Sequence, residues 1–405
     1  MALVIFPVLA AAQDLERLEK IATLIRENKT VTAEQQLTVF MRAKPDQPVA
    51  LNLLGTIRAK QGRLNEAETL FTRAVTKEPR YSGARMNLAY LYMQKREPAK
   101  AVVQLKEVVS LEPGNANALV VLGDAYLANN SLAEAEEQYL LALQGRLDNA
   151  EALFGLAQIS RVKGEVKEAS IILTRIATLT SDSTSPEFLY KFATLALQVG
   201  MSDAAKGALE NALKLRPNEP AYMLALGITW LRKGDLFEAE KLFRRLLQLQ
   251  PTSDQAQVHL GYVLLNQKKY DEARLWLEKS AKSRSPIPEV FYYLGLVAQE
   301  QSDDAKAILL FEKAVQKLPN YAHARIALGA SYIKLRNYTR AKEELETAVK
   351  LDPEEPKAHY NLALLYARLK DPARAQAEMD IVEKLKAKGA GSDGVVVLPP
   401  NPNPR

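Results

Sequence analysis

An alanine recurs every 34 residues through almost the whole chain. One interval, the 36 residues between Ala169 and Ala205, is the exception. A small residue held at a fixed spacing of this length indicates a stack of similar structural repeats. Each repeat of such a stack buries its apolar face against its neighbours, so a chain of 405 residues need not divide into separate compact domains. The alanines of this row are Ala33, Ala67, Ala101, Ala135, Ala169, Ala205, Ala239, Ala273, Ala307, Ala341 and Ala375.

Two further rows keep the same spacing and explain it. Twelve residues before each alanine stands a Gly or Ala in ten of eleven cases, and a large apolar residue follows most alanines by four. Two helices can cross closely only where the crossing is free of bulk, and a larger side chain there would cost about 1–3 kcal/mol of strain. The positions before the alanines are Ile21, Gly55, Ala89, Gly123, Ala157, Ala193, Gly227, Gly261, Gly295, Gly329 and Ala363.

The stretch from Leu51 to Pro79 illustrates one repeat. Apolar residues spaced by three and four on each side of Gly62 predict two amphipathic helices with a turn at this glycine. Pro79 cannot continue the second helix, so it ends the repeat. Elsewhere Asp371 before Pro372 predicts a capped helix start.

Small residues at the eighth and twentieth places, a large one at the twenty-fourth and a closing proline resemble the tetratricopeptide repeat. The resemblance covers eleven repeats from Asp14 to about Ala387. It implies an all-α fold, an α-solenoid in which helix hairpins stack as a right-handed superhelix with a concave groove lined by first helices. We expect repeats one to five at 14–181 and repeats six to eleven at 182–388, as one continuous array. The longer connection, Thr178–Pro186, is a hinge or simply a longer loop.

The two ends lie outside the repeat pattern. Residues 1–12 are apolar and end in Ala10-Ala11-Ala12, which predicts a secretory signal peptide cleaved before Gln13, although the usual basic start is missing. The alternative is an apolar arm packed on the first repeat. Residues 389–405 are predicted to be a disordered, Pro-rich tail. With no separate capping helix, we expect the polar face of the last helix to solvate that end.

The composition offers little for catalysis. The chain has no cysteine, and its three histidines, His259, His323 and His359, fall in three different repeats without a metal-binding spacing. Phosphate-binding loops and nucleophile elbows are missing from the sequence. We therefore predict a protein that is not an enzyme, with no catalytic residue, cofactor or metal, and we expect the histidines to be packed or solvated.

The groove implied by the resemblance carries the candidate binding residues. Aromatic rings beside amide side chains suit an extended peptide or a short helix, since rings supply contact area and amides bond main-chain groups. The alternative is that part of this set packs in the core. The candidates are Asn87, Tyr90, Met93, Gln94, Tyr190, His259, Tyr262, Asn266, Tyr292 and Tyr293.

The charges along the same face do not predict nucleic acid. Its positions hold eight basic and six acidic residues, whereas a phosphate track needs a clustered positive stripe. The leading hypothesis is a scaffold that binds protein or peptide partners in a cell-envelope or secretion assembly, periplasmic or secreted, without stable membrane insertion after signal cleavage. The alternatives are a cytoplasmic location, an adaptor that selects substrates for a separate enzyme such as a glycosyltransferase, and a structural spacer.

Overall fold

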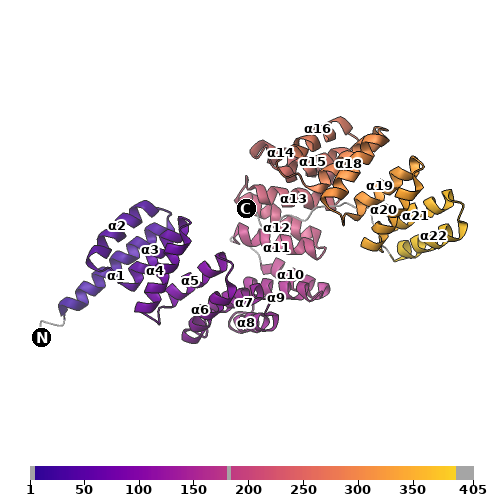
Figure 1. Ribbon diagram of the computed structural model, residues 1–405. Coiled ribbons are helices and arrows are strands. Elements are labelled where there is room, and N and C mark those ends of the chain that lie inside the picture. Colours follow the sequence, from indigo (N-terminus) through magenta and orange to yellow (C-terminus); the bar gives the residue numbers. More distant parts are fainter. Residues whose placement is uncertain (1–4, 180–183, 389–405) are drawn as a thin grey trace. The chain divides into compact units, whose positions relative to one another are not determined.

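The computed structural model describes residues 5–179 and 184–388, with side chains from Gln13 onward. Within these residues every regular element is an α-helix, and consecutive helices form antiparallel hairpins (Figure 1). The chain divides into two halves between Ser181 and Asp182, within the longer connection, and each half is described by itself. The predicted all-α solenoid of stacked helix hairpins is confirmed.

The first half contains five hairpins. Its helices are α1 (Ile5–Arg26), α2 (Thr30–Ala43), α3 (Pro48–Lys60), α4 (Leu64–Lys77), α5 (Ser82–Gln94), α6 (Pro98–Leu111), α7 (Ala116–Ala128), α8 (Leu132–Gly145), α9 (Ala150–Val162) and α10 (Val166–Leu179).

The second half contains six hairpins. Its helices are α11 (Pro186–Gln198), α12 (Ser202–Leu215), α13 (Pro220–Arg232), α14 (Leu236–Leu249), α15 (Asp254–Asn266), α16 (Tyr270–Ala281), α17 (Pro288–Glu300), α18 (Asp304–Lys317), α19 (Ala322–Lys334), α20 (Tyr338–Leu351), α21 (Pro356–Arg368) and α22 (Pro372–Ala387).

The alanine row lies where the two helices of each hairpin meet. Ten of its eleven members have no exposed surface, and only Ala375, in the last repeat, is partly exposed. In the first ten repeats, a large side chain four residues later is buried. At Gly295, for instance, a Cβ atom would lie 2.4 Å from the ring of Phe311. Bulk at either position would separate the helices, as the spacing predicted.

The turn inside each hairpin has a left-handed residue at the same place in all eleven repeats. Only four of these residues are glycines, such as Gly62 with φ 76°, and non-glycine residues adopt φ of 59–62° in the other seven. The left-handed region costs a residue with a side chain roughly 1–2 kcal/mol. The hairpin packing therefore determines the turn, and a sequence search for glycine finds only part of the set.

Within each half, consecutive hairpins stack so that the second helix of one packs on the first helix of the next. First helices also contact one another, through the pairs α1–α3, α3–α5 and α7–α9 in the first half. In the second half the pairs are α11–α13, α13–α15, α15–α17 and α19–α21. This arrangement creates a surface formed by adjacent first helices, which we call the first-helix face, and the second helices form the opposite side.

The two terminal predictions fall largely outside the described residues. Residues 1–4 and the predicted tail, 389–405, are not among them, and α1 begins at Ile5, inside the predicted signal peptide. Within the described ranges, none of the helices combines the length and apolar character that a membrane span requires. The predicted cap at Asp371 is present, since its carboxylate accepts a hydrogen bond from the backbone N–H of Arg374 at 3.1 Å.

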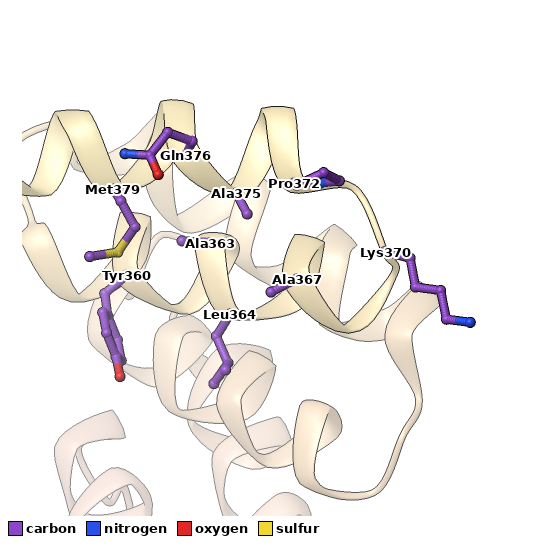
Figure 2. A pocket seen from close by; sticks show the side chains of 9 residues that line it. All are labelled: Tyr360, Ala363, Leu364, Ala367, Lys370, Pro372, Ala375, Gln376 and Met379. Carbon is purple, nitrogen blue, oxygen red and sulfur yellow. The ribbon is translucent and has the colours of Figure 1, made fainter.

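The polar face of the last helix is exposed as expected at Asp380, Lys384 and Lys388, and only Glu378 departs from this expectation. Glu378 turns inward, where one carboxylate oxygen lies 2.7 Å from Nδ1 of His359. Val382 and Leu385 are buried. The outer side of the last hairpin presents Ala375 and Met379, both partly exposed, which line a pocket of about 470 Å³ between α21 and α22 (Figure 2).

Candidate functional site

Eight of the ten candidate residues lie at least partly exposed on the first-helix face. Tyr90 is the most open of the aromatic candidates, with 45% of its surface exposed. The exposed or partly exposed candidates are Asn87, Tyr90, Met93 and Gln94 on α5, Tyr190 on α11, Tyr262 and Asn266 on α15, and Tyr292 on α17.

The two remaining candidates, His259 and Tyr293, are buried. They keep 3% and 2% of their surfaces exposed, so they belong to the core and not to an accessible face. Both stand at the sixth place of a first helix and contact the preceding repeat, Tyr293 through Tyr262 of α15. The His259 ring stacks on Phe243 of α14, with the centroids 5.3 Å apart. Burial lowers the pKa of His259 to about 4, so the imidazole is neutral at pH 7.

A row of amide side chains links three successive first helices in the first half. Asn87 donates a hydrogen bond to Oδ1 of Asn52 at 2.9 Å, and Asn52 donates to the hydroxyl of Tyr81 at 3.2 Å. On the next repeat, Asn117 donates to the Tyr90 hydroxyl at 3.3 Å. We call these five residues the amide ladder. Because the ladder members hold one another, their orientation is set before any partner arrives.

In the second half, contacts between aromatic rings link neighbouring first helices. Tyr190 lies beside Tyr222 of α13, with ring centroids 5.1 Å apart. Further along, Tyr262 contacts Tyr293 at 5.1 Å, and Tyr292 contacts Tyr293 at 5.4 Å and Tyr321 at 5.3 Å. We call these last four residues the tyrosine cluster. Such tilted contacts add to the stabilisation that burial gives.

The titration of the tyrosine cluster argues against acid–base chemistry. Burial, with the neighbouring Tyr262 and Glu355, raises the pKa of Tyr292 to about 12, and burial raises that of Tyr321 further. Burial also raises the pKa of Glu289, on the first turn of α17. Phenols with raised pKa values remain protonated at neutral pH. The cluster therefore offers rings and O–H groups for contact instead of a base or a nucleophile.

Within the described ranges, no three His, Asp or Glu side chains converge in a way that could hold a metal ion. His359 is packed and paired, because Nδ1 lies 2.7 Å from Glu378 and Nε2 lies 3.0 Å from the Pro353 carbonyl oxygen. His323 is partly exposed, with Nε2 3.9 Å from Glu355. The two histidines thus serve separate contacts.

One recurring contact was not predicted from the sequence. The fourth residue of several first helices reaches back to the carbonyl oxygen of the proline six residues earlier. Arg85 reaches Pro79 at 2.8 Å, Gln257 reaches Pro251 at 2.8 Å and Arg325 reaches Pro319 at 2.8 Å. His359 and Pro353 repeat this pattern. The polar residue six positions after these four prolines is visible in the sequence, and its hydrogen bond closes the loop between repeats.

The matches to family models agree with this architecture. A family model described as tetratricopeptide repeat matches residues 86–147, 190–254, 260–322 and 326–390. A second model of the same description matches 58–110, 230–285 and 296–351. A crystal structure of a tetratricopeptide repeat protein from Parabacteroides merdae aligns with 62% of this chain and 98% of its own, at 21% identity and a TM-score of 0.44.

Two curated relatives share part of their length with this chain. Cellulose synthase operon protein C of Xanthomonas axonopodis pv. citri is 29% identical over 234 residues, which are 54% of this chain and 16% of the relative. Human protein O-mannosyl-transferase TMTC3 is 22% identical over 201 residues, which are 49% of this chain and 22% of the relative. The chain thus spans less than a quarter of the length of either relative. Because the family models cover more than half of its residues in register with the helix hairpins, the chain belongs to the tetratricopeptide repeat family.

Proposed function

We propose that this protein is a non-catalytic scaffold that binds a protein or peptide partner along its first-helix face. The observation that carries the proposal is the amide ladder, in which oriented side-chain amides lie next to the open ring of Tyr90. An extended peptide presents one N–H and one C=O per residue, which side-chain amides can bond, and the ring provides apolar contact. Since the ladder is already ordered, binding costs little side-chain entropy.

The tyrosine cluster suggests the chemistry of a partner that reaches the second half. Tyr262 and Tyr292 are partly exposed, and Glu289 is a half-buried carboxyl whose pKa burial raises. A lysine or arginine side chain of a peptide would stabilise the Glu289 carboxylate and lie against tyrosine rings. We therefore favour a partner with a basic residue at this position.

Nucleic acid remains disfavoured because several basic residues of the face are already used between repeats. Lys60 donates to the Ile25 carbonyl oxygen at 3.0 Å, and Arg232 donates to that of Leu197 at 2.6 Å. Lys334 lies 3.3 Å from Asp304. A phosphate backbone would have to compete with these contacts, and the acidic residues on the same face would repel it.

A second function is an adaptor that presents substrates to a separate enzyme such as a glycosyltransferase. The names of the two relatives, a cellulose synthase operon protein and an O-mannosyl-transferase, support it. For location we favour export, with a role in a cell-envelope or secretion assembly, because residues 1–12 end in a signal-like cleavage sequence. Both hypotheses, the scaffold and the adaptor, place the partner on the first-helix face. They differ in which protein binds there.

Site-specific crosslinking in the native cell tests both the face and the export. A photoreactive residue at Tyr90 or Tyr262 is expected to capture a protein or peptide, and mass spectrometry of the purified product is expected to find Gln13 as the first residue. Matched probes at Val103 of α6 and Leu275 of α16 are exposed on second helices and should capture little. Capture from Val103 and Leu275 alone would refute the proposed face, and a retained Met1 would refute cleavage. A captured glycosyltransferase would favour the adaptor.

A further inference from the structure

One carboxyl group on the first-helix face is partly withdrawn from water without a cation to compensate it. Glu289 lies in the first turn of α17 and is partly exposed. Burial raises the pKa of its carboxyl group, and no Lys, Arg or His within the described ranges acts to lower it again. Glu240 in the same half is paired, in contrast, with Arg244 at 2.7 Å and with Lys269 at 3.2 Å. Because a carboxylate withdrawn from water is normally paired, Glu289 is suited to a cation that the described residues do not supply.

A buried hydroxyl group near this carboxylate also lacks a partner. Tyr321 is 6% exposed, and its hydroxyl forms no hydrogen bond within the part of the chain that the structure describes. Burial, the neighbouring tyrosines and the carboxylate of Glu289 raise the pKa of both Tyr321 and Tyr293. The carboxylate therefore lies close enough for its charge to act on both phenols. An unpaired buried hydroxyl is destabilising, and a polar group brought by a partner would relieve it.

Two accessible aromatic rings belong to the same patch. Tyr292 follows Glu289 by three residues on α17, so both lie on one side of the helix, and its ring centroid is 5.3 Å from that of Tyr321. Tyr262 contacts Tyr293 from the preceding repeat at 5.1 Å. Tyr262 and Tyr292 are both partly exposed. Since the face of a tyrosine ring attracts cations, the patch combines a carboxylate, an unpaired hydroxyl and open rings that favour the same kind of group.

We propose that Glu289 and the tyrosine cluster together receive one arginine side chain of the partner peptide, an inference that rests on the binding proposed for the first-helix face. A guanidinium group is planar and carries five N–H donors. It can therefore lie on a tyrosine ring while it donates to the Glu289 carboxylate and to the Tyr321 hydroxyl. A lysine ammonium is more strongly hydrated and loses more on entering a partly buried place. A quaternary ammonium has no N–H donor and would leave both polar groups unpaired.

An NMR titration of the full chain with short capped peptides tests this assignment. The peptide acetyl-Gly-Gly-Arg-Gly-Gly-amide is expected to bind with a dissociation constant on the order of 1 mM. The same peptide with citrulline, an uncharged analogue of arginine, should bind about tenfold more weakly, and the lysine peptide about threefold more weakly. No detectable binding of the arginine peptide at about 10 mM would overturn the proposal, as would equal affinities for the arginine peptide and either of the others.

Two carboxylate variants locate the bound arginine. Glu289→Gln is expected to weaken binding of the arginine peptide about tenfold, because the charge-assisted hydrogen bonds are lost. Glu300→Gln removes an equal charge from the same helix, about 16 Å away along its axis, and should bind as the natural chain does. Unchanged affinity in Glu289→Gln would overturn the proposal, and so would an equal loss in Glu300→Gln.

Tyr321→Phe separates the hydroxyl from the ring. This variant is expected to weaken binding of the arginine peptide about fivefold, while its resistance to denaturant stays equal to that of the natural chain or rises, because the hydroxyl it loses has no partner. A clear fall in stability, or an unchanged affinity, would count against the role assigned to this hydroxyl.

The arginine receptor and the proposed function fail in different ways. Selected peptides that bind through the first-helix face but contain no arginine would overturn the receptor and leave the scaffold proposal intact. Crosslinking from Val103 and Leu275 alone would overturn the scaffold proposal, whatever the affinity of the short peptides.

Discussion

Gly155→Ala is expected to lower the free energy of unfolding of the first half by about 3 kcal/mol, the upper part of the range for overpacking a core. A Cβ atom at Gly155 would lie 2.2 Å from Cζ of Tyr139, which is fully buried between α7, α8 and α9. The Tyr139 ring cannot move away freely, because it is also packed closely against Gly123 and its hydroxyl donates to Asp124 at 2.7 Å. Inside a helix, replacing glycine with alanine normally stabilises the protein by about 1 kcal/mol. The expected effect at Gly155 therefore has the opposite sign.

Gly207→Ala is the matched control. Gly207 also lies inside a helix, α12, but a Cβ atom at this position would have no neighbour within 4 Å, so alanine should stabilise by up to about 1 kcal/mol. In a Tyr139→Leu background, the Gly155→Ala cost should largely disappear, since leucine already fills this place in other repeats. Denaturant unfolding followed by circular dichroism measures the natural chain, the three single variants and the double variant. A Gly155→Ala variant as stable as the natural chain would show that the close crossing does not determine the repeat.

The second large effect concerns pH and the buried His259. Its pKa of about 4 in the folded protein lies below the unfolded value near 6.5, so the unfolded chain binds the extra proton first. Folding stability from this group is therefore complete above pH 6.5 and falls as the pH drops toward 4. The loss amounts to about 3 kcal/mol, from 1.36 kcal/mol for each pKa unit.

His259→Phe is expected to remove this part of the acid loss while keeping a ring against Phe243. Comparing the stabilities of the natural chain and the variant at pH 7.5 and at pH 4.5 cancels the carboxylates that both proteins share. Relative to the natural chain, the variant should have a higher free energy of unfolding at pH 4.5 than it has at pH 7.5. If the stability difference is the same at both pH values, His259 titrates alike in the folded and unfolded chain. That result would contradict its burial.

The packing of the hairpins was predictable because it depends on volume at fixed spacing. Ala341 and Gly329 could be assigned to a crossing from their register alone, and the structure buries both against Leu345. The turns were less accessible to sequence reasoning. Arg96 and Lys370 adopt left-handed φ because the helices on both sides are held by packing, and neither residue type favours that conformation by itself.

The binding face was harder to predict because exposure depends on the rotation of each first helix. Tyr262, at the ninth place of α15, is partly exposed, whereas Tyr293, at the sixth place of α17, is buried in contact with it. The hydrogen-bond partners of Asn52 and Asn117 lie about 30 residues away, in the neighbouring repeat. Contacts between neighbouring repeats of this kind cannot be read from one repeat.

Binding by the first-helix face is tested most directly with a peptide selected on the natural chain from an unbiased library of unstructured peptides. Its affinity is then measured by calorimetry for Tyr90→Ala and Tyr262→Ala and for the second-helix controls Val103→Ala and Leu275→Ala. We predict that at least one tyrosine replacement weakens binding about tenfold or more, as expected for an aromatic hot spot, and that both controls bind as the natural chain does. Unchanged affinity in both tyrosine variants with a loss in either control would contradict the proposed face.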